Sequence, residues 1–204
     1  MLEEKIVFTI GFIILFFFAS WFFAKREKNP NYKTASIVAS VTSLSYLLML
    51  SGQATILNYS GEMVYFSRWF FYIVSCSLLM VTMVNVLKTK KDNILPILIL
   101  NSMVMLSGAI AALLESPMKW VVFALGCVFF INQIILLFEG KSNKKTKDKV
   151  KFFIYFGWSL FPIIFILAPE GIGIINNLTA AILYFGLDLL TKVIFYFQLN
   201  KIKK

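Results

Sequence analysis

Long apolar stretches follow one another along the chain, and short polar segments separate them. About 20 apolar residues in a helix are enough to cross the hydrocarbon core of a bilayer. Runs close to that length occur at residues 6–24, 34–57, 64–87, 94–114, 119–138, 152–168 and 173–199. This pattern predicts an all-α membrane protein in which a seven-transmembrane-helix bundle forms a single domain over residues 1–204.

The composition supports a membrane protein rather than a soluble one. Hydrophobic residues make up 59% of the 204 positions, and 22 of them are Phe, which exceeds the apolar share of soluble domains. Glu3 and Glu4 precede the first apolar run, which lacks the basic segment and the small-residue cleavage site of a signal peptide. We therefore expect this run to be retained as the first helix.

Basic residues gather in every second loop and at the end of the chain. They are Lys25, Arg26, Lys28, Lys33, Lys88, Lys90, Lys91, Lys141, Lys144, Lys145, Lys147, Lys149, Lys151, Lys201, Lys203 and Lys204. Because cytoplasmic loops are enriched in Lys and Arg, we expect an extracellular N-terminus and a cytoplasmic C-terminus in a multi-pass protein of the cell membrane. The lipid bilayer is thus the expected partner, and the net charge of +10 needs no nucleic acid to explain it.

Several kinds of chemistry are disfavoured by the residues present. The chain has no His, and Cys76 and Cys127 both fall inside apolar runs, so neither a metal site nor a disulfide is expected. Gly171 and Gly173 mark a turn between the last two runs rather than a phosphate-binding loop.

The last apolar run contains an acid and a base, Asp188 and Lys192, four residues apart. This spacing brings the two side chains together on one face of a helix. Ionisable residues within a membrane span are uncommon and usually functional. Two interpretations remain open from the residues alone: a structural ion pair between helices, or a lysine that carries a Schiff base with Asp188 as its counterion.

These residues resemble the microbial rhodopsins, in which retinal is attached to a lysine four residues after an aspartate in the seventh helix. The resemblance extends over most of the chain. It includes an arginine in the third span, aromatic and proline positions in the sixth, and two positions each in the second and fourth. The matching residues are Arg68, Trp158, Phe161, Pro162, Phe165, Tyr46, Gly52, Asn101 and Gly108. The resemblance implies all-trans retinal bound covalently to Lys192 as a protonated Schiff base.

One stripe of the third span indicates the direction of transport. At 100° per residue, Phe71, Ser75 and Thr82 fall within about 40° of one another and are expected to face the bundle interior. In outward proton pumps of the family, the first of these positions is an aspartate that accepts the Schiff-base proton. Without it, Asp188 is the sole carboxylate counterion, and an ordinary outward pump is disfavoured.

Phe71, Ser75 and Cys76, with Tyr72 at a position where many family members have Trp, resemble the schizorhodopsins, which are inward proton pumps. The subfamily has a glutamate where this chain has Thr82, and that glutamate is implicated in passing the proton to the cytoplasm. Threonine cannot hold a proton as a carboxylate does. Two accounts follow: a proton path through water held by Thr82, Asn85 or Asn101, or a loss of net transport in a sensory photoreceptor.

The resemblance therefore implies a light-driven ion transporter rather than an enzyme, with an inward proton pump as the leading function. In this interpretation Arg68 helps to keep Asp188 ionised, and Ser75 and Cys76 form hydrogen bonds near the Schiff base. Thr82, Asn85 and Asn101 line the cytoplasmic path. The expected retinal contacts are Phe71, Tyr72, Gly108, Trp158, Phe161, Pro162 and Phe165. The family also suggests a homo-oligomer, specifically a trimer.

The alternatives belong to other functional classes. A non-pumping or weakly pumping sensory rhodopsin would act on a transducer, and we expect no attached signalling domain after residues 201–204. A light-gated channel would need a hydrated polar pathway, whereas this interior offers few polar groups. A seven-helix transporter without retinal would stay colourless when retinal is added.

Overall fold

The computed structural model describes residues 2–200, except the side chain of Asn200. Within that range, seven helices have the length and apolar composition needed to cross a membrane. Five are single helices: α1 (Leu2–Ala24), α2 (Pro30–Ser51), α3 (Phe66–Leu87), α4 (Ile94–Leu113) and α5 (Met118–Phe138). The sixth joins α6 (Lys144–Phe153), η3 (Ile154–Trp158) and α7 (Leu160–Leu167). The seventh joins α8 (Asn177–Leu189), η4 (Leu190–Ile194) and α9 (Phe195–Asn200).

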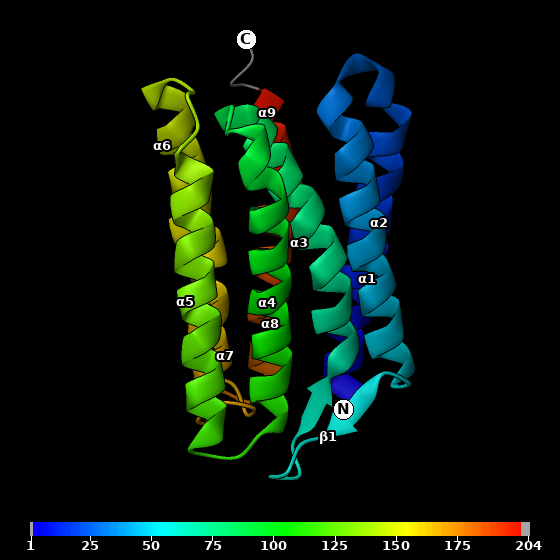
Figure 1. The fold of residues 1–204 in the computed structure, drawn as a ribbon. Coiled ribbons are helices and arrows are strands. Elements are labelled where there is room, and N and C mark those ends of the chain that lie inside the picture. The colour runs from blue at the N-terminus through cyan, green and yellow to red at the C-terminus, as the bar shows by residue number, and fades with distance from the viewer. Residues whose placement is uncertain (1, 201–204) are drawn as a thin grey trace.

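The helices stand side by side in one bundle (Figure 1). α3 packs against α2 and α4, α4 packs against α5, and α8 packs against both α1 and α7. The N-terminus and a small β-hairpin lie at one end of the bundle, and α6 and the end of α9 reach the other. We call these the hairpin end and the C-terminal end. Large apolar side chains such as Phe16, Phe17 and Phe70 are exposed on the outside, as a lipid-facing surface requires.

The second helix is shorter than the predicted run of residues 34–57. It begins at Pro30, where the Asn29 side chain accepts a hydrogen bond from the Asn31 N–H, and it ends where Gly52 adopts a left-handed φ of 71°. The chain then forms an antiparallel hairpin of β1 (Thr55–Leu57) and β2 (Met63–Tyr65). The predicted helix was too long at this end because apolar residues continue beyond the helix cap at Gly52. The hairpin was not predicted.

The boundaries of the last two spans also differ from the prediction. The sixth begins at Lys144 rather than at residue 152, because the Asn143 side chain caps a lysine-rich first turn through the Thr146 N–H at 2.8 Å. The seventh begins at Asn177 rather than at residue 173, with Asn176 as its cap. Two short 3₁₀ helices, η1 (Arg26–Lys28) and η2 (Lys91–Asn93), lie in loops at the C-terminal end.

Two π-helical segments, η3 and η4, interrupt the sixth and seventh spans and contact each other. Gly157 in η3 approaches η4 so closely that a Cβ atom there would lie 2.7 Å from Cγ2 of Thr191. π-helical turns are frequent at functional sites because they shift the side chains that follow them. Here η4 contains Lys192, and η3 contains Trp158.

Candidate functional site

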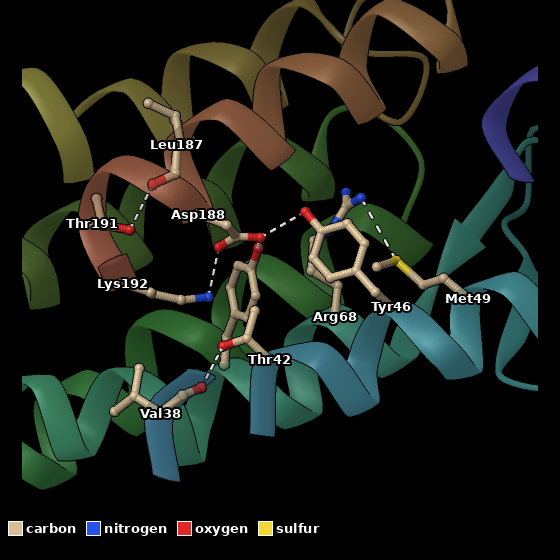
Figure 2. A network of polar contacts seen from close by, with 10 residues as sticks. Val38, Thr42, Tyr46, Met49, Arg68, Leu187, Asp188, Thr191 and Lys192 are labelled. Atoms are coloured by element: carbon tan, nitrogen blue, oxygen red, sulfur yellow. Dashed lines mark hydrogen bonds and ion pairs between the residues drawn. The ribbon is translucent and has the colours of Figure 1, made fainter. Parts of the chain in front are cut away.

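The centre of the site is a buried ion pair on the seventh span (Figure 2). Nζ of Lys192 donates to Oδ1 of Asp188 at 2.6 Å, and the two side chains are only 1% and 0% exposed. The i, i+4 spacing predicted this contact. Two charges without water are costly to bury unless further hydrogen bonds compensate the lost hydration.

Two tyrosines supply that compensation. The hydroxyl groups of Tyr46 on α2 and Tyr72 on α3 both donate to Oδ2 of Asp188, at 2.8 Å and 2.6 Å. The Lys192 amine also lies 3.5 Å from the centroid of the Tyr72 ring, within the range of a cation–π contact. Donors from three helices therefore converge on one carboxylate, which stabilises its ionised form.

Arg68 lies on α3 one turn closer to the hairpin end than Tyr72. Its guanidinium carbon is 4.1 Å from the centroid of the Tyr184 ring, and an NH2 group reaches the Met49 sulfur at 3.7 Å. Among the described residues it forms no direct ion pair with Asp188. The Nε atom of Arg68 and the hydroxyl of Tyr184 are buried without a hydrogen-bond partner within residues 2–200. Both groups can therefore still form a hydrogen bond.

A mainly apolar cavity opens beside Lys192 between the third to seventh spans. Its walls are formed by Arg68, Trp69, Tyr72, Cys76, Met80, Asn101, Val104, Met105, Gly108, Phe123, Gly126, Cys127, Phe130, Gln133, Trp158, Phe161, Pro162, Phe165, Tyr184, Thr191 and Lys192. At Gly108 a Cβ atom would overlap the ring of Trp69, so only glycine lets the two helices approach this closely.

Aromatic rings pack tightly along the sixth span beside this cavity. Phe161 stacks on Tyr184 with centroids 6.0 Å apart and meets Tyr72 edge to face at 5.9 Å. Phe165 stacks on Phe123 at 5.1 Å and an angle of 7°. These contacts pack aromatic rings against one another along one wall of the cavity.

Most residues singled out from the sequence meet at this cavity. The exceptions on α3 are Phe71, Ser75, Thr82 and Asn85. Phe71 is half-buried with its ring against Phe70 at 5.8 Å, because Arg68, Tyr72 and Cys76 share the face that lines the cavity. Ser75 is buried, and its hydroxyl has no hydrogen-bond partner in the described part of the chain.

Asn85 is exposed on the outside of α3, whereas its neighbours Val84 and Leu87 face the bundle. The expectation that Asn85 lines an internal path is therefore corrected by its position on the helix. Asn101 does lie at the cavity, where its side chain donates to Oγ of Ser77 at 3.0 Å. Thr82 is buried between the cavity and the C-terminal end, and its hydroxyl lies 3.2 Å from that of Tyr196.

The comparisons with known proteins agree with this geometry. A sequence profile described as bacteriorhodopsin-like protein matches residues 3–202. The chain belongs to the bacteriorhodopsin-like family. Members of this family are light-driven ion transporters or photoreceptors and not enzymes. This rhodopsin is therefore a multi-pass membrane protein.

Individual relatives differ in how much they share with this rhodopsin. The crystal structure of schizorhodopsin 4 has 37% sequence identity and a TM-score of 0.87, covering 96% of this chain and 98% of the other. The light-driven proton pump LR (Mac) from Leptosphaeria maculans shares the fold, with a TM-score of 0.87 and 19% identity over 97% of this chain and 92% of its own. Sensory rhodopsin-2 from Haloarcula vallismortis is 22% identical over 178 residues, which are 82% of this chain and 75% of the relative.

The family implies a retinal chromophore, and the residues of this rhodopsin fit that group. A long apolar molecule needs a mainly apolar cavity and an amine in its wall to form a covalent link. The cavity provides both, because aromatic side chains line it and the buried Lys192 lies in its wall. Gly108 and Gly126 also line the cavity, and a side chain at either position would press against Trp69 or Ser107.

Sequence reasoning missed several residues of the site. Tyr46 was noted only as a family match, and Tyr184, Trp69 and Tyr196 were not singled out. A tyrosine among many aromatic residues gives no local sign of its partner. The carboxylate that Tyr46 contacts is 142 positions away in the chain.

Proposed function

We propose that this rhodopsin is a light-driven inward proton pump with all-trans retinal on Lys192 as a protonated Schiff base and Asp188 as its counterion. When bound, retinal supplies a light-driven change in the direction of the N–H bond at Lys192 Nζ. The proposal rests on one observation above the others. Asp188 carries the carboxylate beside Lys192, and its oxygens already accept hydrogen bonds from Lys192, Tyr46 and Tyr72.

In this proposal Asp188 acts as a counterion rather than as a proton acceptor. Three donors stabilise the charged carboxylate, so taking up a proton there would sacrifice strong hydrogen bonds. Phe71 stands where outward pumps of the family have an accepting aspartate, and its half-buried ring offers no site for a proton. Among the described residues that contact the ion pair on the hairpin side, none is therefore proposed to accept a proton that leaves Lys192 Nζ.

The proposed orientation places the hairpin end outside the cell. All basic residues except Lys5, Arg68, Lys119 and Lys192 belong to the loops, helix ends and C-terminus assigned to the opposite side. Because positive loops stay in the cytoplasm, the C-terminal end is proposed to face the cytoplasm. The proton lost from Lys192 Nζ then moves inward.

Replacement of that proton needs a route from the hairpin end. A small second pocket there is lined by Met63, Val64, Tyr65, Arg68, Trp69, Glu170, Asn177, Ala180 and Ala181. Arg68 and Trp69 line both this pocket and the main cavity, so their side chains form the wall between the two. We infer that protons reach Lys192 from outside past Arg68 and Asp188.

The test is the sign of the light-induced pH change in an unbuffered suspension of cells that make the protein with retinal. Inward transport raises the external pH, and a protonophore abolishes the rise. Acidification on illumination would refute the proposal. A matched pair of variants sharpens the test: Phe71→Leu should keep the inward direction, whereas Phe71→Asp adds a carboxylate to α3 and should weaken or reverse it.

Thr82 supports a second candidate, a sensory or weakly pumping photoreceptor. Its hydroxyl is held by the Leu78 carbonyl and Tyr196, and it offers no carboxylate toward the C-terminal end. A visible band with a photocycle but no pH change in either direction would favour this alternative.

A further inference from the structure

A hydrogen bond between Thr82 and Tyr196 connects the third and seventh spans on the C-terminal side of Lys192. The two oxygens are 3.2 Å apart, and the residues are 5% and 0% exposed. Tyr196 lies four positions after Lys192, about one helical turn or 6 Å along the span. The pair thus lies on the route that the proposed inward transport requires.

The direction of this hydrogen bond follows from the second contact of Thr82. Its hydroxyl also contacts the Leu78 carbonyl at 3.0 Å, and a carbonyl oxygen only accepts. Because threonine has a single hydroxyl proton, Thr82 donates to Leu78 and accepts from Tyr196. The Tyr196 oxygen receives no hydrogen bond from another group within residues 2–200, so it retains the capacity to accept a proton on its Lys192 side.

The surroundings of the pair are apolar. The Tyr196 ring meets Phe22 at 6.1 Å and Phe195 at 5.5 Å, and it belongs to the same buried cluster as Leu79 and Met83. A buried hydroxyl in such a region is costly unless it is paired.

We propose that Tyr196 and Thr82 form a two-hydroxyl relay that carries the proton from Lys192 toward the C-terminal end, in place of a carboxylate. The inference rests on the proposed inward direction and names the groups on the exit side. Tyr196 is a relay residue whose oxygen takes the proton first, by way of a bridging water. Thr82 is the residue from which the proton leaves.

The relay conserves charge at every step. Tyr196 Oη accepts one proton on a lone pair while its own hydroxyl proton passes to Thr82 Oγ1. Thr82 in turn releases its proton toward water at the C-terminal end, after its hydroxyl turns away from the Leu78 carbonyl. One proton enters and one leaves, and both hydroxyl groups are neutral before and after.

The test compares Tyr196→Phe, Thr82→Val and the double variant by flash spectroscopy of the purified protein with retinal. The rate at which Lys192 Nζ loses its proton is read from the blue shift of the visible band. Each single variant should slow this step on the order of tenfold or more, and the double variant should be no slower than either single one. Thr82→Ser retains the hydroxyl and should restore the rate.

Ser36→Ala is the matched control, because Ser36 is also a buried hydroxyl on the C-terminal side but bonds only to the Ala19 carbonyl. It should leave the rate unchanged. A second readout needs no light-driven turnover: infrared spectra of the protein in the dark with isotope-labelled tyrosine. Thr82→Val should shift the C–O stretch of Tyr196, and Ser36→Ala should not.

Unchanged rates in both single variants, or additive slowing in the double variant, would overturn the relay. Outward proton movement by the unsubstituted protein would overturn the proposed function instead, whatever the variants do. Inward movement with an unaltered rate in Tyr196→Phe would overturn the relay alone. Thr82→Glu offers a further check, since a carboxylate at this position should make the rate independent of the Tyr196 hydroxyl.

Discussion

The two halves of the bundle on either side of Lys192 differ in polarity. Toward the hairpin end, Tyr46, Tyr72, Arg68 and Tyr184 surround the ion pair, and a second pocket continues past them. Toward the C-terminal end, packed apolar side chains enclose Tyr196 and its partner Thr82.

The polar half holds the charged pair, and the apolar half contains the proposed route of the proton. In the polar half, hydrogen bonds from Lys192, Tyr46 and Tyr72 to Asp188 stabilise the charged pair. A charge is costly to bury in the apolar half, so the proposed relay passes the proton between neutral hydroxyl groups there. The proposed inward transport is directed toward this apolar half.

The largest expected effect comes from Lys192→Ala, which removes the amine that is proposed to carry retinal. The variant should lose the visible absorption band completely, because no other buried amine lies at the described cavity. Absorption spectra of protein purified with retinal check this. Lys119→Ala is the control, since Lys119 is also buried but lies outside the cavity wall. A band that persists without Lys192 would contradict the retinal assignment.

The next largest effect is expected for Asp188→Asn, which removes the charge that pairs with Lys192. Removing one partner of a buried ion pair leaves the other charge uncompensated and costs about 3–5 kcal/mol. Thermal denaturation should show a large loss of stability. Asp92→Asn, at an exposed position, should change it by less than about 0.5 kcal/mol. Equal stabilities of the two variants would show that Asp188 is not the main partner of Lys192.

Tyr46→Phe and Tyr72→Phe should have smaller effects because each removes only one donor. A hydrogen bond to a charged group contributes about 1.5–3 kcal/mol. Both hydroxyl groups donate to Oδ2 of Asp188, so the two losses should not be additive. A double-mutant cycle of thermal stability measures this coupling. Tyr155→Phe on the exposed surface is the control, and strict additivity would argue against a shared oxygen.

The smallest effect concerns Glu170, in the second pocket at the hairpin end. Burial raises the pKa of the Glu170 carboxyl above its usual value, although Arg68 and Lys119 act to lower it. The folded protein then holds this proton to higher pH than the unfolded chain does. Stability should therefore be greatest below the ordinary pKa and fall as the pH rises through the raised one.

Glu170→Gln should flatten that pH dependence. Thermal denaturation of both proteins over a pH series from 4 to 8 measures it, with Glu115→Gln, a carboxyl on the loop between α4 and α5, as control. The same slope in Glu170→Gln as in the unsubstituted protein would show that this carboxyl titrates as it does in the unfolded chain.

The sequence predicted what depends on local periodicity. The i, i+4 contact of Asp188 and Lys192 follows from helix geometry alone, and the seven spans follow from apolar runs. The family resemblance supplied part of the cavity wall, including Trp158, Phe165 and Gly108. The ion pair and the spans were predictable because a short stretch of sequence contains the whole signal, whereas the resemblance draws on several spans.

The remaining features depend on how the helices are rotated and joined. The contacts of Tyr46 and Tyr72 with Asp188 join residues 142 and 116 positions apart, and no local pattern reveals them. Asn85 was expected to hold water on an internal path, but packing turns its neighbours Val84 and Leu87 inward instead. The Thr82–Tyr196 pair spans 114 positions and likewise required the assembled bundle.

The most direct test of the central claim is a photocurrent recorded under voltage clamp from a membrane that contains the protein in known orientation. We predict an inward current at zero membrane potential that changes in size but not in sign over the voltage range, and that is absent in Lys192→Ala. A channel would instead reverse its current with voltage. An outward current, or one that reverses, would contradict inward proton pumping.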